Sequence, residues 1–146
     1  MIRDQGSGIN NAALVYIAIG SNVGDRHKHV ESARAAIAGL TDTFIVAASS
    51  VEETAPLGGR QQEMYLNQML AVTTGLDPEQ LLDELQRIET EHGRTRRERW
   101  DSRTLDLDIV SFGDLALASA RLTVPHPGLA EREFWQREIA QIEEAL

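Results

Sequence analysis

The sequence predicts an α+β fold, in which helices pack on an antiparallel sheet. Apolar, β-prone runs alternate with stretches whose apolar residues recur at helical spacing. Two of the predicted strands follow each other with only a loop between them, and a last helical pattern ends the chain. The resulting order, β-α-β-β-α-β and then a helix, is typical of a ferredoxin-like domain with an additional C-terminal helix.

The first half of the chain supplies two of these strands and a helix. Residues 13–22 (ALVYIAIGSN) are apolar and end in a Gly-Ser-Asn turn signal, which predicts a buried strand. Asp25 is a suitable N-cap for the helix that follows. Residues 44–54 (FIVAASSVEET) are predicted as the second strand, and a loop with Pro and two Gly covers 55–63. The core-facing residues of the helix are expected to be Val30, Ala33, Ile37 and Leu40.

The second half repeats the pattern and adds the final helix. A third strand is predicted over 64–74, and Asp77-Pro78-Glu79-Gln80 is a helix start with an N-cap and a Pro at the first helical position. Gly93 is the expected stop of that helix. A fourth strand is predicted over 104–113, and a short extended segment over 122–128. The buried faces of the two helices are expected to be Leu81, Leu82, Leu85 and Ile88, and Trp135, Ile139, Ile142 and Leu146.

Length and composition indicate one domain over 14–146 with a flexible tail over 1–13, because 146 residues at 42% hydrophobic content can bury a sizeable core. No apolar run approaches the roughly 18 residues of a membrane span, so no membrane partner is expected. The chain has no Cys, which excludes disulfides and suits a cytoplasmic location. The net charge of −9 argues against general nucleic-acid binding, which needs an extended basic face.

Positive charge is nevertheless concentrated in one segment. Residues 94–103 hold five Arg against Glu98 and Asp101, on a body that is otherwise strongly acidic. Such arginines could simply be solvated or paired with those acids. A compact cationic loop on an acidic body, however, favours a small anionic ligand. A mobile loop that closes over polyphosphate would account for the repulsion among the arginines.

A pair of carboxylates follows on the adjacent strand. Asp106 and Asp108 are two residues apart, so they share one face of the strand, about 6–7 Å apart, while Leu105, Leu107 and Ile109 share the other. A solvated polar face would explain an isolated Asp-x-Asp equally well. Beside the arginines, the pair indicates an Mg-nucleotide site, because carboxylates hold hard cations and guanidinium groups hold phosphate oxygens.

Two further features are open to two interpretations. Tyr65 and Asn67 share a strand face, which suits stacking and paired hydrogen bonds to a flat heterocycle, but a tyrosine packed on the core is the commoner case. His126 lies between two prolines and could either donate to a phosphate or bond locally in a turn. No pattern supports a serine nucleophile, a Walker-type phosphate loop or a histidine metal site.

Several motifs together make the chain resemble the 6-hydroxymethyl-7,8-dihydropterin pyrophosphokinase family of folate biosynthesis. The resemblance runs from Tyr16 to about Phe134. Its landmarks are Y-I-A-I-G-S-N at 16–22, S-S-V-E-E-T-A-P-L-G at 49–58, Y-L-N at 65–67, G-R-T-R at 93–96, R-W-D-S-R-T-L-D-L-D-I at 99–109 and L-T-V-P-H-P at 122–127. Two departures are an Asp at 101, where the family usually has Gly, and a helical end in place of a proline-containing apolar segment.

The resemblance implies transfer of pyrophosphate from ATP to the pterin hydroxymethyl group, with release of AMP. It implies two Mg²⁺ ions held by Asp106 and Asp108, and a monomer that could associate with other folate-pathway enzymes. The pterin positions that it implies are Thr54, Leu57, Tyr65, Asn67 and Phe134. The nucleotide positions are Glu89, Arg94, Arg96, Trp100, Arg103, Ile109, Arg121, Thr123, His126 and Arg132, among which Arg94, Arg96 and Arg103 would act in catalysis with the two aspartates.

Two rival functions lead to different expectations. A catalytically weak homologue would bind a pterin or nucleotide as a regulator. The departures at 101 and at the C-terminal end favour it, whereas the intact Asp-x-Asp pair and the arginines oppose it. An RNA-binding ferredoxin-like domain would need interleaved aromatic residues on its strands and a basic surface, and the sequence has neither.

Overall fold

The computed structural model describes residues 12–55, 64–93 and 104–146, and these form the predicted α+β fold. The main sheet is antiparallel with the strand order β2-β4-β1-β5, and β3 also pairs with β4. A small second sheet pairs β6 with β7. The elements are β1 (Ala13–Ser21), α1 (Arg26–Ala38), β2 (Thr43–Ala48), β3 (Glu52–Thr54), β4 (Tyr65–Thr74), α2 (Pro78–Glu91), β5 (Asp106–Phe112), β6 (Leu117–Ala118), β7 (Thr123–Val124) and α3 (Glu133–Ala145).

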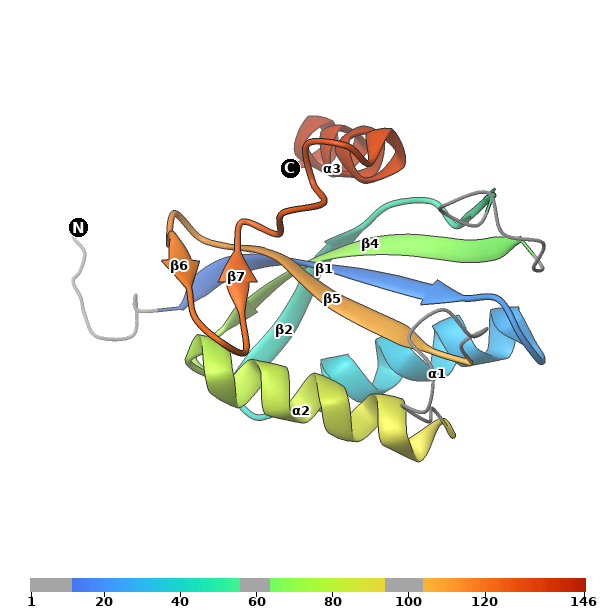
Figure 1. Ribbon diagram of the computed structural model, residues 1–146, viewed down its shortest axis with the longest axis horizontal. Helices are drawn as coiled ribbons and strands as arrows, with labels where there is room; N and C mark the ends of the chain where they lie inside the picture. Colours follow the sequence, from blue (N-terminus) through green and yellow to red (C-terminus); the bar gives the residue numbers. More distant parts are fainter. Residues whose placement is uncertain (1–11, 56–63, 94–103) are drawn as a thin grey trace.

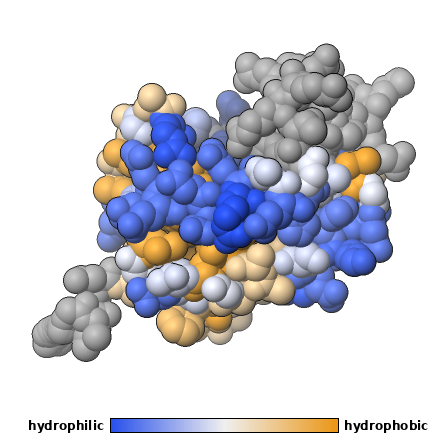
Figure 2. Space-filling view, turned by 90° about the horizontal axis from the view of Figure 1, so that it is seen from below, coloured by the Kyte–Doolittle hydropathy of each residue, from blue (hydrophilic) through white to orange (hydrophobic). Residues whose placement is uncertain are grey.

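Helices lie on both faces of the main sheet. α1 and α2 cover one face, and α3 crosses the other (Figure 1). The larger apolar cluster joins α1 and α2 to side chains such as Ile17, Leu70 and Leu107, and the smaller one joins α3 to Tyr16, Met69 and others. Seen from the side of α1 and α2, the middle of the surface is largely hydrophilic (Figure 2). On the second face, α3 covers one part of the sheet and leaves another part uncovered, where a site can form (Figure 1).

The predicted helix boundaries are confirmed by their caps. The Asp25 side chain accepts a hydrogen bond from the Lys28 amide at the start of α1. Asp77 and Gln80 form a reciprocal capping box at the start of α2. Gly93 follows α2 with a φ of +83°, a conformation that favours glycine. In the part of the chain that the structure describes, no helix has the length and apolar character needed to cross a membrane.

The segment predicted as one strand over 44–54 is in fact two strands, β2 and β3. The Ser49 amide donates to the Met69 carbonyl, but the Ser49 hydroxyl in turn accepts from the Met69 amide. A side chain thus replaces a backbone carbonyl in the ladder, which breaks the strand. β3 then pairs with the start of β4, where Thr54 lies opposite Tyr65.

The buried face of α3 also differs from the prediction. Trp135 and Ile142 are buried and Ile139 is partly buried, as expected, but Leu146 is 63% exposed at the end of the chain. The third fully buried residue of the helix is Glu138, at 2% exposure. The apolar periodicity therefore predicted the helix correctly. The helix is, however, rotated about its axis so that an acidic residue faces the sheet.

β5 contains a bulge that fixes the segment after β7. The register between β1 and β5 shifts between Tyr16 and Ile17, which leaves Val110 as the extra residue. The Val110 carbonyl accepts a hydrogen bond of 2.8 Å from the His126 amide. This bond attaches the His126 backbone to the edge of the strand that carries Asp106 and Asp108.

Candidate active site

The sheet register brings the predicted pterin and metal residues into adjacent rows. Gly20 of β1 is paired with Asn67 of β4 on one side and with Asp106 of β5 on the other. In the next row, Ala18 lies between Met69 and Asp108. Neighbouring strands are about 4.8 Å apart, so Asn67 and Asp106 are separated by roughly 10 Å across Gly20. The row places an amide and a carboxylate on the face that α3 leaves partly uncovered.

A polar and aromatic group surrounds Asn67. Its Nδ2 atom donates a hydrogen bond of 2.6 Å to the Thr54 hydroxyl, which leaves the Asn67 carbonyl oxygen directed elsewhere. That oxygen and the Tyr65 ring lie next to Gly20, since a Cβ there would be 3.3 Å from Asn67 Oδ1 and 3.4 Å from Tyr65 Cδ1. Because Gly20 has no side chain, the surface between the Asn67 oxygen and the Tyr65 ring is left open.

The two aspartates lie on this same face. Asp106 and Asp108 are both half-buried, whereas Leu105, Leu107 and Ile109 are buried in the core beneath α1 and α2. The alternation predicted from the sequence is therefore confirmed. Within the described ranges, no three His, Cys, Asp or Glu side chains gather into a metal-binding group. Two carboxylates fit Mg²⁺ even so, because this ion is commonly bound by one or two carboxylates together with substrate phosphates.

His126 lies beside the aspartates with a defined tautomer. Its Nδ1 atom accepts a hydrogen bond of 2.9 Å from the Gly128 amide, which assigns the proton of the neutral ring to Nε2. Nε2 is 3.8 Å from Asp108 Oδ1, too far for a direct hydrogen bond. Burial lowers the pKa of His126 and the charge of Arg132 lowers it further, while Asp106 opposes both effects. The neutral ring therefore presents an N–H group near the carboxylates.

The remaining predicted residues have varied environments. Glu89 is 3% exposed, and its carboxylate accepts a bond of 2.7 Å from the Leu107 amide, so it supports β5. Arg121 is exposed and bonds Asp83 of α2 at 2.7 Å. Thr123 is exposed on β7, and the side chain of Ile109 is in the core, so that only its backbone is available to a ligand. Arg132 precedes α3 directly and Phe134 lies in its first turn, partly buried near Trp135.

Five predicted residues lie outside the described residues. They are Leu57, Arg94, Arg96, Trp100 and Arg103. Their roles remain predictions from the sequence.

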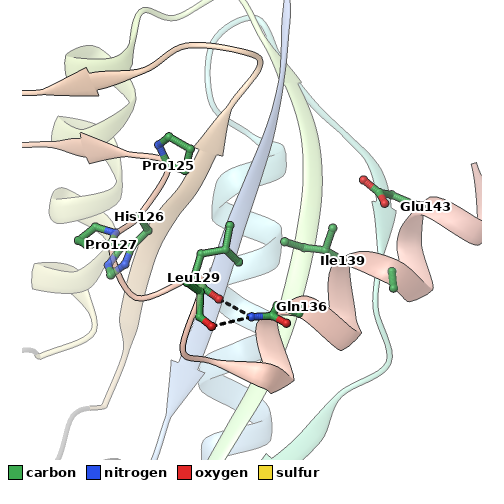
Figure 3. A pocket seen from close by; sticks show the side chains of 9 residues that line it. Pro125, His126, Pro127, Leu129, Gln136, Ile139 and Glu143 are labelled. Carbon is green, nitrogen blue, oxygen red and sulfur yellow. Dashed lines mark hydrogen bonds between the residues drawn. The ribbon is translucent and has the colours of Figure 1, made fainter.

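A pocket of about 460 Å³ opens between the segment 125–130 and α3 (Figure 3). Its lining is mainly apolar and includes Leu129 and Ile139, with His126 at one end and Glu143 at the other. Gln136 spans the base of the segment through bonds to the Leu129 and Ala130 carbonyls. Because the pocket shares only His126 with the residues described above, it is a neighbour of the carboxylate row and not its centre.

Sequence reasoning missed the contribution of Gly20. From the sequence, the Gly-Ser-Asn segment predicts only a turn at the end of the first strand, whereas the register places Gly20 in the middle of the row. The available signal was its place at the end of a buried strand, where a glycine often marks close approach of another group.

Comparison with known proteins gives consistent matches. The family model described as 7,8-dihydro-6-hydroxymethylpterin-pyrophosphokinase matches residues 16–144. The chain is 45% identical to the 2-amino-4-hydroxy-6-hydroxymethyldihydropteridine pyrophosphokinase of Haemophilus influenzae over 119 residues, which are 82% of this chain and 74% of that protein. It is 41% identical to the protein of the same name from Bacillus subtilis, over 92% of this chain and 79% of that one. It is also 35% identical to the folic acid synthesis protein fol1 of Schizosaccharomyces pombe, over 83% of this chain and 16% of that protein.

Proposed function

Because the chain belongs to the 7,8-dihydro-6-hydroxymethylpterin-pyrophosphokinase family, and so transfers pyrophosphate from ATP to hydroxymethyldihydropterin in folate synthesis, we propose that the uncovered face of its sheet is the active site. The row Asn67–Gly20–Asp106 carries this proposal. It places a heterocycle-binding amide and a metal-binding carboxylate on one surface, with no side chain between them.

The pterin is proposed to lie over Gly20, against the Tyr65 ring. Asn67 is oriented by its bond to Thr54, so its carbonyl oxygen can accept from the amino group or a ring N–H of the heterocycle. Phe134, at the start of α3, is proposed as the second stacking ring, and Leu57 as a further contact. With the ring held there, the hydroxymethyl group points across Gly20 towards Asp106.

Mg²⁺ is proposed to bind Asp106 and Asp108. The donor set fits, because both carboxylates are on the open face and phosphate oxygens of ATP can complete the coordination. Bound there, two Mg²⁺ ions would neutralise the charge of the phosphate oxygens. The nucleotide is proposed to lie along β5, where the backbone of Ile109, Arg121, Thr123 and the supporting Glu89 are found.

The protein's contribution to the reaction is positioning and charge stabilisation. The hydroxymethyl oxygen attacks the β-phosphorus of ATP, the bond from that phosphorus to the α-phosphate oxygen breaks, AMP leaves, and the hydroxyl proton is released to solvent. His126 is proposed to donate its Nε2–H to a phosphate oxygen, and Arg132 to contact the same anion. The arginines Arg94, Arg96 and Arg103, with Trp100, are proposed to close over the phosphates. This division of labour requires no nucleophile from the protein.

Product analysis tests the proposed reaction directly. The protein should convert ATP, Mg²⁺ and 6-hydroxymethyl-7,8-dihydropterin into equal amounts of AMP and a pterin that has gained two phosphates, and chelator should stop both. Ion-exchange separation of the nucleotides and pterins gives the measurement. ADP with a monophosphorylated pterin would contradict attack at the β-phosphorus. Binding without any product, in protein shown to be folded, would support the regulatory rival.

Gly20→Val should block the pterin without unfolding the sheet. The new Cβ would be 3.3 Å from Asn67 Oδ1, and its methyl groups would occupy the floor of the site. Val suits a strand, so the Tm should be retained. The Kd of the pterin, from its intrinsic fluorescence, should rise by at least about tenfold, equivalent to about 1.4 kcal/mol. Gly20→Ala should give a smaller rise, and an unchanged Kd in both variants would place the pterin elsewhere.

The setting of the enzyme is proposed in two respects. A monomer suffices for the reaction, because the residues proposed for pterin, metal and phosphate all come from one chain. A cytoplasmic location agrees with ATP as a substrate and with the absence of Cys. Association with other folate enzymes is supported by fol1, of which this chain corresponds to only 16%.

A further inference from the structure

A buried tryptophan contacts two of the residues proposed to bind phosphate. Trp135 is 3% exposed and lies in the first turn of α3, in the apolar cluster between this helix and the sheet. Its ring meets the His126 imidazole edge to face, with centroids 4.9 Å apart. The Arg132 guanidinium carbon is 4.3 Å from the centroid of the same ring, a distance at which cation–π attraction operates. One ring therefore contacts both an imidazole and a guanidinium.

The backbone of Gly128 lies against the same two side chains, His126 and Arg132. Its amide donates to His126 Nδ1 at 2.9 Å and so fixes the Nε2–H tautomer. A Cβ at this residue would be 3.0 Å from Arg132 Nε, 3.1 Å from Arg132 Cζ and 3.2 Å from His126 Nδ1. These distances are tighter than nearly all real Cβ contacts, so a side chain here would push Arg132 and His126 a few tenths of an ångström from their present positions.

We propose that Trp135 and Gly128 are positioning residues that hold Arg132 and His126 ready for the phosphates of ATP. The inference rests on the proposed function, which assigns those two side chains to the nucleotide. A free arginine loses rotamer entropy when it is fixed. Holding the guanidinium between a ring and a backbone before ATP arrives removes part of that loss from binding.

A purely structural role for Trp135 leads to a different expectation. The ring belongs to the apolar cluster between α3 and the sheet, so its truncation would lower stability whatever else it does. Gly128 separates the two roles. It is not among the glycines with positive φ in the described residues, so Ala is allowed there by its backbone. Its nearest obstacle is the far end of a flexible arginine, so Gly128→Ala should fold and displace the guanidinium.

The first test compares ligand affinities of full-length variants. Gly128→Ala should raise the Kd of an Mg-bound, non-hydrolysable ATP analogue about tenfold, the equivalent of one charge-assisted contact. The Kd of the pterin and the Tm should stay at wild-type values. Gly39→Ala is the matched control, because a Cβ there would meet only backbone oxygens at 3.6 and 3.7 Å and lies at the end of α1. Wild-type affinity for the analogue in Gly128→Ala would overturn the inference.

Arg132→Ala distinguishes failure of the inference from failure of the proposed function. If Arg132→Ala leaves the Kd of the analogue unchanged, Arg132 does not bind the nucleotide and its proposed role is wrong. If Arg132→Ala weakens binding, Gly128→Ala should add little in that background, because the displaced group is already gone. Fully additive losses would contradict positioning through Arg132.

Trp135→Phe and Trp135→Leu give a second test should Gly128→Ala fail to fold. Phe keeps an aromatic face for Arg132 and His126, whereas Leu keeps only apolar volume. The Kd of the analogue should remain within about threefold of wild type in the Phe variant and rise about tenfold in the Leu variant. Equal affinities in the two folded variants would show that the ring only fills the core.

Discussion

Asp106→Asn and Asp108→Asn should each lower kcat by about a thousandfold or more while the fold is retained. Removal of a proposed metal ligand should take away several kcal/mol of stabilisation of transition-state charge, and each 1.36 kcal/mol is a factor of ten in rate. Asn has nearly the same shape as Asp, and both aspartates are half-buried on the open face, so no cavity forms in the core. The loss should therefore appear in kcat and not in the Tm.

Steady-state release of AMP at saturating ATP and pterin measures this effect. The Kd of the pterin without nucleotide should change little, because Asp106 is separated from Asn67 by Gly20. Asp114→Asn is a suitable control, since it removes an exposed carboxylate in the turn after β5. Turnover near that of wild type in both aspartate variants would show that the metal is held elsewhere.

The fold was predictable wherever a local signal specified an element. Asp25, Asp77 and Gly93 mark helix ends, and the structure uses all three as caps or stops. The division of 44–54 into two strands was not predictable from β-propensity, because it depends on the Ser49 hydroxyl meeting Met69 of another strand. Likewise, periodicity identified α3 but not its rotation, which is set by packing against the sheet.

The strand faces on which the candidate site residues lie were predictable from the sequence, and their arrangement in space was less so. The two-residue spacings of Asp106 with Asp108 and of Tyr65 with Asn67 correctly placed each pair on one face. The two pairs lie near each other because β4 and β5 both pair with β1, in a register that puts Gly20 between Asn67 and Asp106. No local sequence pattern predicts that register. His126 is attached by its amide to Val110, the bulge residue of β5, and this bulge is a tertiary feature that no local pattern predicts.

Glu138 shows the strongest conflict between local pattern and packing. The residue is 2% exposed, and both of its carboxyl oxygens are buried. Glu52 lies beside it and is bonded to Arg137 at 2.7 Å. Burial and the nearby carboxylate of Glu52 raise the pKa of Glu138 to about 9. The positive charge of Arg137 lowers this pKa but is outweighed. At neutral pH Glu138 is therefore protonated and can donate its O–H to Glu52.

This raised pKa makes folding stability fall as pH rises. Between the ordinary value of 4.5 and about 9, folded Glu138 keeps a proton that the unfolded chain releases. The folded state binds more protons in this window, so the free energy of unfolding decreases with pH, and the decrease ends above the folded pKa. Glu138→Gln removes the titration, because an amide is neutral in both states and its N–H can still donate to Glu52.

Glu138→Gln should therefore leave the Tm nearly unchanged at pH 5 and raise it by about 3–6 °C at pH 8. At pH 8 the substitution should restore about 1–2 kcal/mol of the free energy of unfolding that wild type loses through Glu138. Thermal unfolding followed by circular dichroism from pH 5 to pH 9 gives the measurement, and the gap between the two proteins should widen throughout. Glu144→Gln removes an exposed carboxylate from the same helix and should follow the wild-type curve. Parallel curves for wild type and Glu138→Gln would mean that Glu138 is ionised in the folded protein, with Arg137 compensating its charge instead of Glu52 sharing its proton.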